Sequence, residues 1–138
     1  MKHTFEQKVY YSDTDAYGVV WHGSYLRWLE KGRVDWCEVL GHNLVDLEAQ
    51  DIVLPVTNLN VRYKASAKLN DVVLVETEIS KLNPITMVFS QTVRDKNSGR
   101  VFIQAEVEVV AINKAGKLYR RIPEVLTNSI KEVLKCQD

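Results

Sequence analysis

The chain has 138 residues, of which 46% are hydrophobic and 26% are charged. This size predicts a single domain over residues 1–138 that can bury a core without disulfides or structural metals. Eighteen basic residues balance eighteen acidic ones, and no basic arm or stripe stands out, so we predict no binding to nucleic acid. The sequence has no apolar run long enough to span a membrane and no signal segment at its start, which favours a cytoplasmic protein.

The first part of the chain predicts one strand followed by one long helix. Residues 5–11 have the pattern of a strand that ends at a polar turn. Over residues 24–40, apolar side chains recur at helical spacing, with charged side chains on the opposite face. Ser24 is expected to be the N-cap of this helix, and Gly41 its C-terminal stop. Gly32, within the apolar stripe, is expected to let another backbone approach closely.

The rest of the chain is rich in strands. A short helix is expected at residues 43–50, and a last helix at 123–135 with Pro123 in its first turn. Four strands are expected over residues 52–68, 71–82, 85–96 and 100–112. The last of them alternates apolar and polar side chains, which favours an antiparallel sheet with one covered face. The elements together predict an α+β fold in which a curled antiparallel sheet of about five strands surrounds one long central helix.

The segment before the long helix is the most informative for function. Asp15 lies in a turn that contains Gly18, directly ahead of the predicted helix. The backbone N–H groups of residues 18–22 are candidates to stabilise a developing oxyanion, while the carboxylate attacks a carbonyl or directs water at it. The structural alternative is that Asp15 only caps the helix or closes an Asx turn.

The run Tyr11-Ser12-Asp13-Thr14-Asp15-Ala16-Tyr17-Gly18-Val19-Val20-Trp21-His22, followed by Tyr25, Glu30 and Arg33, resembles the hotdog-fold acyl-CoA thioesterases. The branch that it resembles is that of the 4-hydroxybenzoyl-CoA and YbgC-like thioesterases, and the resemblance extends over nearly the whole chain. It implies a hotdog fold, hydrolysis of an acyl-CoA thioester to a free acid and CoA, and no cofactor. It also implies a homodimer or homotetramer with active sites between subunits.

The resemblance assigns roles to particular residues. Asp15 corresponds to the catalytic carboxylate, acting as nucleophile or general base, and His22 and Tyr11 correspond to positions that assist it. In the 4-hydroxybenzoyl branch, the residue that matches His22 lends its backbone N–H to the thioester carbonyl. Candidate substrate-binding residues are Tyr17, Gly18, Val19, Trp21 and Tyr25. Tyr17 stands where many relatives have a small residue, so its ring is expected to shape the acyl pocket.

Several residues also have ordinary structural interpretations. Asp13 is expected to form the turn rather than to act as a second acid. Glu30 and Arg33 are three residues apart on the predicted helix, which favours an ion pair over a role in the site. Tyr11 either packs at the strand end or donates a hydrogen bond to the catalytic carboxylate. His22 acts either through a neutral ring or only through its backbone.

Neither a metal nor a disulfide is expected. Cys37 and Cys136 fit no CxxC motif and no Cys/His metal spacing, so we expect free thiols in a reducing compartment. His3 and His42 likewise have no partners at metal spacing. The candidate contacts for the phosphates of CoA are Arg62, Lys64, Lys68, Arg94, Lys96 and Arg100.

The sequence leaves other functions to be weighed against acyl-CoA hydrolysis. The same chemistry acts on acyl-carrier-protein thioesters, and a hotdog module can bind acyl-CoA as a regulator without turnover. Hydratase or dehydratase chemistry on this fold pairs an Asp with a His five residues further on. Asp15 and His22 are seven residues apart, which argues against it.

Overall fold

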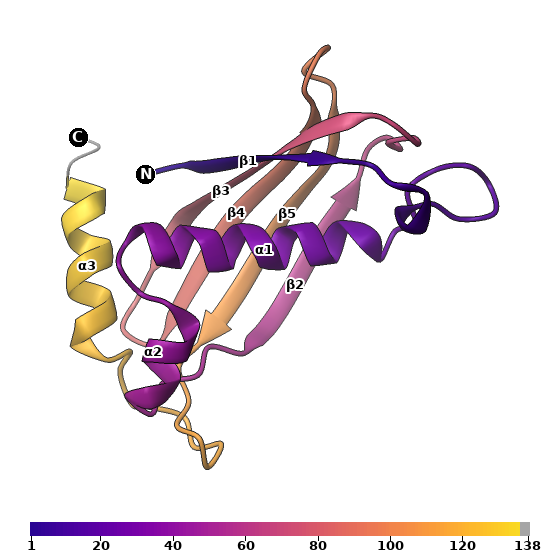
Figure 1. Ribbon diagram of the computed structural model, residues 1–138. Coiled ribbons are helices and arrows are strands. Elements are labelled where there is room, and N and C mark those ends of the chain that lie inside the picture. The colour runs from indigo at the N-terminus through magenta and orange to yellow at the C-terminus, as the bar shows by residue number, and fades with distance from the viewer. Residues whose placement is uncertain (136–138) are drawn as a thin grey trace.

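The computed structural model describes residues 1–135. Five strands form one antiparallel sheet in the order β1-β3-β4-β5-β2. The strands are β1 (His3–Lys8), β2 (Val56–Tyr63), β3 (Val72–Leu82), β4 (Thr86–Asp95) and β5 (Val101–Val110). The helices are α1 (Ser24–Val39), α2 (Leu44–Ala49) and α3 (Glu124–Lys135), and Tyr11–Asp13 forms one 3-10 turn, η1. Figure 1 shows α1 lying across one face of the curved sheet, as the predicted α+β fold requires.

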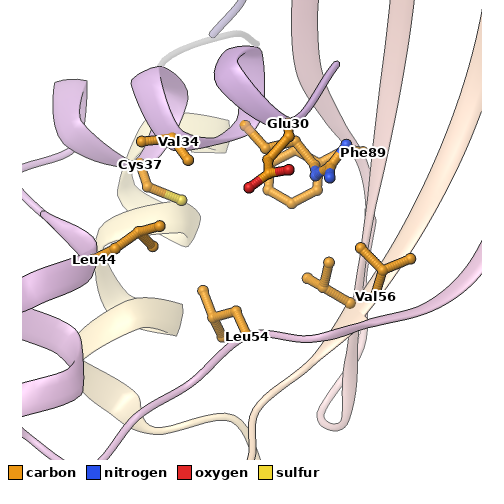
Figure 2. Close-up of a pocket in the computed structure, with 9 residues that line it drawn as sticks. Glu30, Val34, Cys37, Leu44, Leu54, Val56 and Phe89 are labelled. Carbon is orange, nitrogen blue, oxygen red and sulfur yellow. The ribbon is translucent and has the colours of Figure 1, made fainter. Parts of the chain in front are cut away.

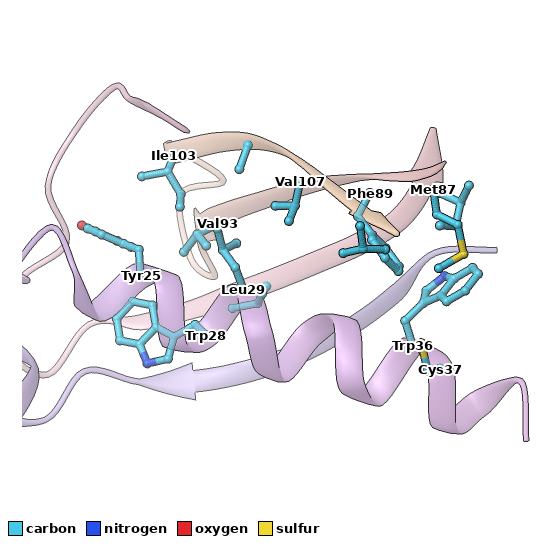
Figure 3. Close-up of a cluster of buried hydrophobic side chains, with 14 of the residues drawn as sticks. Tyr25, Trp28, Leu29, Trp36, Cys37, Met87, Phe89, Val93, Ile103 and Val107 are labelled. Carbon is cyan, nitrogen blue, oxygen red and sulfur yellow. The ribbon is translucent and has the colours of Figure 1, made fainter. Parts of the chain in front are cut away.

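The core lies between α1 and the sheet. α1 packs on β1, β3 and β4, and it buries the aromatic stripe that its sequence predicts. Trp36 packs edge-on against Phe89 of β4, with ring centroids 5.5 Å apart, and Figure 3 shows the two rings beside Met87. Each large apolar side chain buried in this way contributes roughly 1.5–3 kcal/mol to folding. The helix is therefore fixed to the sheet along most of its length.

Gly32 marks the closest approach of α1 to the sheet. A Cβ at this position would lie 2.5 Å from Thr77 Oγ1 and 3.0 Å from Gln91 Nε2. Both side chains are buried, and Gln91 Nε2 donates to Thr77 Oγ1 and to the Leu29 carbonyl, each at 2.8 Å. The predicted close approach is confirmed, but polar side chains of β3 and β4, rather than another backbone, make it.

The ends of the first strand and of α1 differ from prediction for local reasons. β1 ends at Lys8 rather than at residue 11, because the Asp13 carboxylate accepts the Tyr10 N–H at 2.9 Å and closes η1. The N-cap of α1 is Gly23 and not Ser24, whose hydroxyl instead donates to the Asp13 carbonyl at 3.0 Å. The prediction for Asp13 as a turn former is thus confirmed, and that for Ser24 is wrong.

The later elements follow their sequence patterns more closely. Gly41, with φ +91°, ends α1 as predicted. β3, β4 and β5 lie within their expected ranges, whereas β2 is shorter than residues 52–68. After Tyr63 the chain leaves the regular ladder, because the next two N–H groups both donate to the Phe102 carbonyl. α3 begins at Glu124, one residue later than predicted.

β2 forms one edge of the sheet, and three of its four apolar side chains are exposed. Val56, Leu59 and Tyr63 pair with Val109, Val107 and Ile103 of β5, all buried on the helix side. Since cross-strand partners point to the same face of a sheet, these three β2 side chains also face the helix side. They are nevertheless 44%, 43% and 46% exposed, because α1 lies over β1, β3 and β4. We call Val56, Leu59 and Tyr63 the β2 stripe.

Candidate active site

Asp15 begins a tight loop between η1 and α1, at the right in Figure 1. The Asp15 N–H donates to the Val19 carbonyl at 2.9 Å, and the Gly18 N–H donates to the Asp15 carbonyl at 3.0 Å. Gly18 has φ +77°, a conformation that glycine adopts without strain. Asp15 Oδ1 accepts the Tyr17 N–H at 2.8 Å. Oδ1 therefore closes an Asx turn, while Oδ2 has no hydrogen-bond partner within residues 1–135.

Short hydrogen bonds hold this loop against the start of α1 and against the connection that follows β2. The Trp21 N–H donates to the Asp13 carbonyl at 2.8 Å, which the Ser24 hydroxyl also contacts. The Val20 N–H donates to the Ala67 carbonyl at 2.9 Å, and the Ala67 N–H donates to the hydroxyl of buried Tyr25 at 3.0 Å. The position of Asp15 is thus set by both the helix and the sheet edge.

A shallow pocket of about 360 Å³ opens beside the loop. Its lining residues are Asp15, Val19, Val20, His22, Tyr63, Lys64, Ala65 and Ser66. We call it the Asp15 pocket. One half-buried carboxylate lies here beside a lysine, a tyrosine and a histidine, and the remaining walls are small or apolar. A carbonyl compound that entered this pocket would come within reach of the carboxylate.

The free backbone donors near this pocket overlap only in part with those predicted. The N–H groups of Gly18, Val20 and Trp21 already donate to the carbonyls of Asp15, Ala67 and Asp13. Within the described residues, the N–H groups of Val19, His22 and Gly23 donate to no protein acceptor. Val19 and His22 line the pocket, whereas Gly23 follows His22 just outside the predicted 18–22 range. The His22 and Gly23 amides immediately precede α1, where the helix dipole favours negative charge, so these two are the stronger candidate oxyanion donors.

Tyr63 is a pocket residue that sequence reasoning missed. Its hydroxyl donates to the His22 carbonyl at 2.8 Å, across a separation of 41 residues. Burial raises the pKa of Tyr63, so its hydroxyl remains a donor at neutral pH. The His22 ring lies edge-on to the Tyr63 ring at 6.5 Å and packs at 5.0 Å from the Trp21 ring. Such a contact between a strand end and a turn leaves no periodic signal in the sequence.

The other predicted site residues are dispersed around the loop. Tyr25 is buried, and burial raises its pKa. Trp21 folds over Gly23, where a Cβ would meet its ring. Tyr11 and Tyr17 are 82% and 90% exposed, and neither lines the Asp15 pocket. Within the described chain, the Tyr11 hydroxyl makes no hydrogen bond to Asp15 and its ring is not packed.

A second pocket, of about 290 Å³, lies between the latter half of α1 and the start of β2. Its lining residues are Glu30, Arg33, Val34, Cys37, Leu44, Leu54, Val56, Phe89 and Val109. We call it the apolar pocket. Figure 2 shows the Glu30 carboxylate pointing into it, with Cys37 and Leu44 on one side and Val56 on another. Burial raises the pKa of Cys37 to about 11, so its thiol is a neutral part of the wall.

The predicted Glu30–Arg33 ion pair is wrong. No Glu30–Arg33 contact is among the ion pairs of residues 1–135, and Arg33 Nη1 instead donates to Gln91 Oε1 at 2.9 Å. Gln91 is buried, and its amide nitrogen is held by Leu29 and Thr77, so its oxygen faces Arg33 as a fixed acceptor. Burial lowers the pKa of Arg33, and the charge of Glu30 opposes that shift.

Comparison with known proteins identifies the family. Residues 9–130 match the model of the Thioesterase-like superfamily. The chain belongs to this superfamily. It is 30% identical over 125 residues to the acyl-CoA thioester hydrolase YbgC of Escherichia coli O6:H1, covering 91% of this chain and 92% of that protein. It is 39% identical over 89 residues to the acyl-CoA thioesterase YbgC of Haemophilus influenzae, covering 64% of this chain and 65% of that protein.

The fold comparison agrees with the sequence comparison. A DHNA-CoA thioesterase from Staphylococcus aureus superposes with a TM-score of 0.89 at 29% identity, covering 99% of this chain and 93% of that one. The five-stranded sheet and its central helix match those of hotdog-fold thioesterases. The predicted family and the predicted hotdog fold are therefore both confirmed.

In this thioesterase-like chain, two of the six basic residues predicted to bind phosphate pair with carboxylates, and one lines the Asp15 pocket. Arg94 pairs with Glu76 at 2.8 Å and Lys96 with Glu6 at 2.7 Å, so both are engaged elsewhere. Lys64 lines the Asp15 pocket.

Within residues 1–135, no three His, Cys, Asp or Glu side chains gather as a metal site would require. No helix in that part of the chain combines the length and apolar character needed to cross a membrane.

Proposed function

We propose that this protein is an acyl-CoA thioesterase that hydrolyses an acyl-CoA to a carboxylic acid and CoA. One observation carries the proposal: Asp15 has one oxygen fixed in an Asx turn and the other without a partner among residues 1–135, beside a pocket at the start of α1. Membership of the Thioesterase-like superfamily supports it. The names of the YbgC relatives, acyl-CoA thioesterase and acyl-CoA thioester hydrolase, point to CoA as the thiol.

The proposed reaction uses the Asp15 carboxylate and the free amides directly before α1. The thioester oxygen would accept hydrogen bonds from the His22 and Gly23 N–H groups, which donate to no other acceptor in the described residues. These donors would stabilise the oxyanion formed when the carbonyl carbon is attacked. Two routes fit Asp15. Its Oδ2 attacks the carbon, expels CoA thiolate and forms an anhydride that water then cleaves, or it takes a proton from the attacking water.

We further propose that the working unit is a two-fold dimer, alone or paired into a tetramer, joined along β2. The support is the β2 stripe, an apolar row on an open sheet edge, which natural proteins normally cover. Antiparallel pairing of two β2 strands would place the Tyr63 end of one strand beside the Val56 end of the other. Tyr63 lines the Asp15 pocket, and Val56 lines the apolar pocket. The two pockets would then adjoin across the interface, and the acyl group would occupy the partner's apolar pocket.

Thiol release from a panel of acyl-CoA esters tests the activity directly. Release is followed with a free-thiol reagent, corrected for the protein's own cysteines. An acyl-carrier-protein ester and a binding measurement on the same esters distinguish the alternatives. Turnover of the carrier-protein ester alone would assign the second substrate class. Tight binding of acyl-CoA without any release would make the protein a regulator and overturn the proposed activity.

Asp15→Asn tests the residue that carries the proposal. We expect turnover to fall by about 10²-fold or more, the scale of a positioned proton-transfer group. The matched control is Asp13→Asn in the same loop. Within residues 1–135, the one hydrogen bond of the Asp13 carboxylate is that from the Tyr10 N–H. An amide oxygen also accepts this bond, so this variant should retain activity within a few-fold. Near-normal turnover in Asp15→Asn, with wild-type unfolding, would falsify the role of Asp15.

A further inference from the structure

We infer that Tyr63 is a positioning residue, which holds the His22–Gly23 peptide so that its N–H group, that of Gly23, meets the thioester oxygen. This inference rests on the proposed thioesterase function. It assigns a task to a residue on β2 that is remote in sequence from the Asp15 loop. Tyr63 would not touch the reacting atoms; it would act through the backbone that does.

The geometry singles out one hydrogen bond. Tyr63 ends β2, and its hydroxyl donates to the His22 carbonyl at 2.8 Å. Its ring packs at 5.9 Å from the ring of buried Tyr25 and at 6.5 Å from that of His22. Because Tyr25 is fixed in the core, the Tyr63 ring has a rigid surface behind it. The hydroxyl is therefore directed from the sheet edge onto the turn before α1.

The other hydrogen bonds of this turn hold the residues around the peptide but not the peptide itself. Trp21 N–H and the Ser24 hydroxyl both donate to the Asp13 carbonyl. The Val20 N–H donates to the Ala67 carbonyl. Within the described residues, the hydrogen bond from Tyr63 is the one that engages a group of the His22–Gly23 peptide. The Ser24 N–H donates to the Trp21 carbonyl at 2.8 Å and closes a turn around this peptide. Without the bond from Tyr63, the central peptide of that turn would be free to flip, because a glycine at the second central position permits either orientation.

Fixing a carbonyl also fixes the amide on the other side of its peptide. The peptide is trans, as all bonds of the described chain are, so the Gly23 N–H points opposite to the His22 carbonyl. A donor on the carbonyl oxygen additionally polarises the N–H of the same peptide. Tyr63 therefore both aims the Gly23 amide and strengthens it as a donor. Gly23 has no side chain that would restrict the peptide in its place.

Tyr63→Phe removes this hydroxyl and retains the ring. The variant keeps both amide donors, so its effect should be smaller than the 10²–10³-fold loss seen when one oxyanion donor is deleted. We expect kcat to fall about tenfold with KM nearly unchanged, because orientation matters most in the transition state. The unfolding transition, the oligomeric state and the shape of the pH–rate profile should match those of the wild type. An unchanged profile separates positioning from proton transfer by the phenol.

Tyr119→Phe is the matched control. The Tyr119 hydroxyl also donates to a backbone carbonyl, that of Asp51, at 2.6 Å, but at the α2 end of the molecule. This variant should leave kcat unchanged. Wild-type kcat in Tyr63→Phe, an equal loss in Tyr119→Phe, or a loss that merely follows dissociation of the subunits would each overturn the inference.

A measurement that needs no turnover keeps the inference separate from the proposed function. In ¹⁵N–¹H spectra, the Gly23 and His22 amide signals should shift or broaden in Tyr63→Phe and stay in place in Tyr119→Phe. If the wild type releases no thiol from any ester, the thioesterase proposal fails while these spectra still report on Tyr63. If the two amide signals are unmoved in Tyr63→Phe, Tyr63 does not position this peptide.

Discussion

Replacing Gly32 by alanine changes the free energy of unfolding in two opposite ways, because it improves helix propensity and crowds the packing of α1 on the sheet. In a solvent-exposed helix, Gly→Ala raises stability by about 1 kcal/mol. Here the new Cβ would lie 2.5 Å from Thr77 Oγ1 and 3.0 Å from Gln91 Nε2. These two buried side chains are hydrogen-bonded to each other at 2.8 Å, so neither can yield without losing that bond. Overpacking of this kind typically costs about 1–3 kcal/mol. We therefore expect Gly32→Ala to lower the free energy of unfolding.

Urea unfolding followed by tryptophan fluorescence measures that free energy directly. A double-mutant cycle with Thr77→Ala, which removes the nearer oxygen, should show a coupling of about 1 kcal/mol or more, so that alanine at position 32 is better tolerated in that background. Thr77→Ser retains the oxygen and should give no such relief. A Gly32→Ala variant that is more stable than the wild type, or a cycle that is additive, would refute the close approach of α1 to the sheet.

Two further predictions concern the buried thiol and the open sheet edge. The Cys37 pKa is raised from 9.0 to about 11, so between these pH values the unfolded state binds fewer protons and stability falls as pH rises. Relative to Cys37→Ala, the wild type should lose up to about 3 kcal/mol of unfolding free energy from pH 9 to pH 11. Plots of unfolding free energy against pH that run parallel for the two proteins would contradict this. Leu59→Asp, in the β2 stripe, should dissociate the dimer by sedimentation analysis, whereas Asn60→Asp on the opposite face of β2 should not. A dimer that survives Leu59→Asp would place the interface elsewhere.

The sequence predicted the elements whose signals are periodic. The 3.6-residue spacing that includes Trp36 located α1, and the alternation of Val107 with its polar neighbours located β5. The glycine stop at Gly41 was also correct, because a left-handed residue at a helix end is a local requirement. These features depend on residues close together in the chain. Local chemistry alone is enough to predict them.

The wrong or missing predictions concern side chains that hydrogen-bond to a partner other than the one their local sequence suggests. The sequence favours pairing Arg33 with Glu30, three residues away, but Arg33 donates to Gln91 across 58 residues. The sequence also favours Ser24 as an N-cap, but its hydroxyl donates to the Asp13 carbonyl. The hydrogen bond from the Tyr63 hydroxyl to the His22 carbonyl has no signal in the sequence and is not predicted at all. For Arg33 and Tyr63 the contact forms only when the sheet packs on the segment that contains α1, and for Ser24 it depends on how the turn before α1 folds back, neither of which a single sequence reports.

The two sequence interpretations of Asp15, turn residue and catalytic acid, are compatible because the carboxylate has two oxygens. Oδ1 holds the Tyr17 N–H at 2.8 Å, and this bond limits the rotation of the carboxylate and aims Oδ2. Asparagine can keep the first contact through its amide oxygen while losing the anionic second oxygen. Alanine loses both. If the turn serves to aim the acid, Asp15→Asn should unfold like the wild type and lose only turnover, whereas Asp15→Ala should also destabilise the loop. Equal stability in the two variants would mean that the turn contributes nothing, and the aim of Oδ2 would then need another cause.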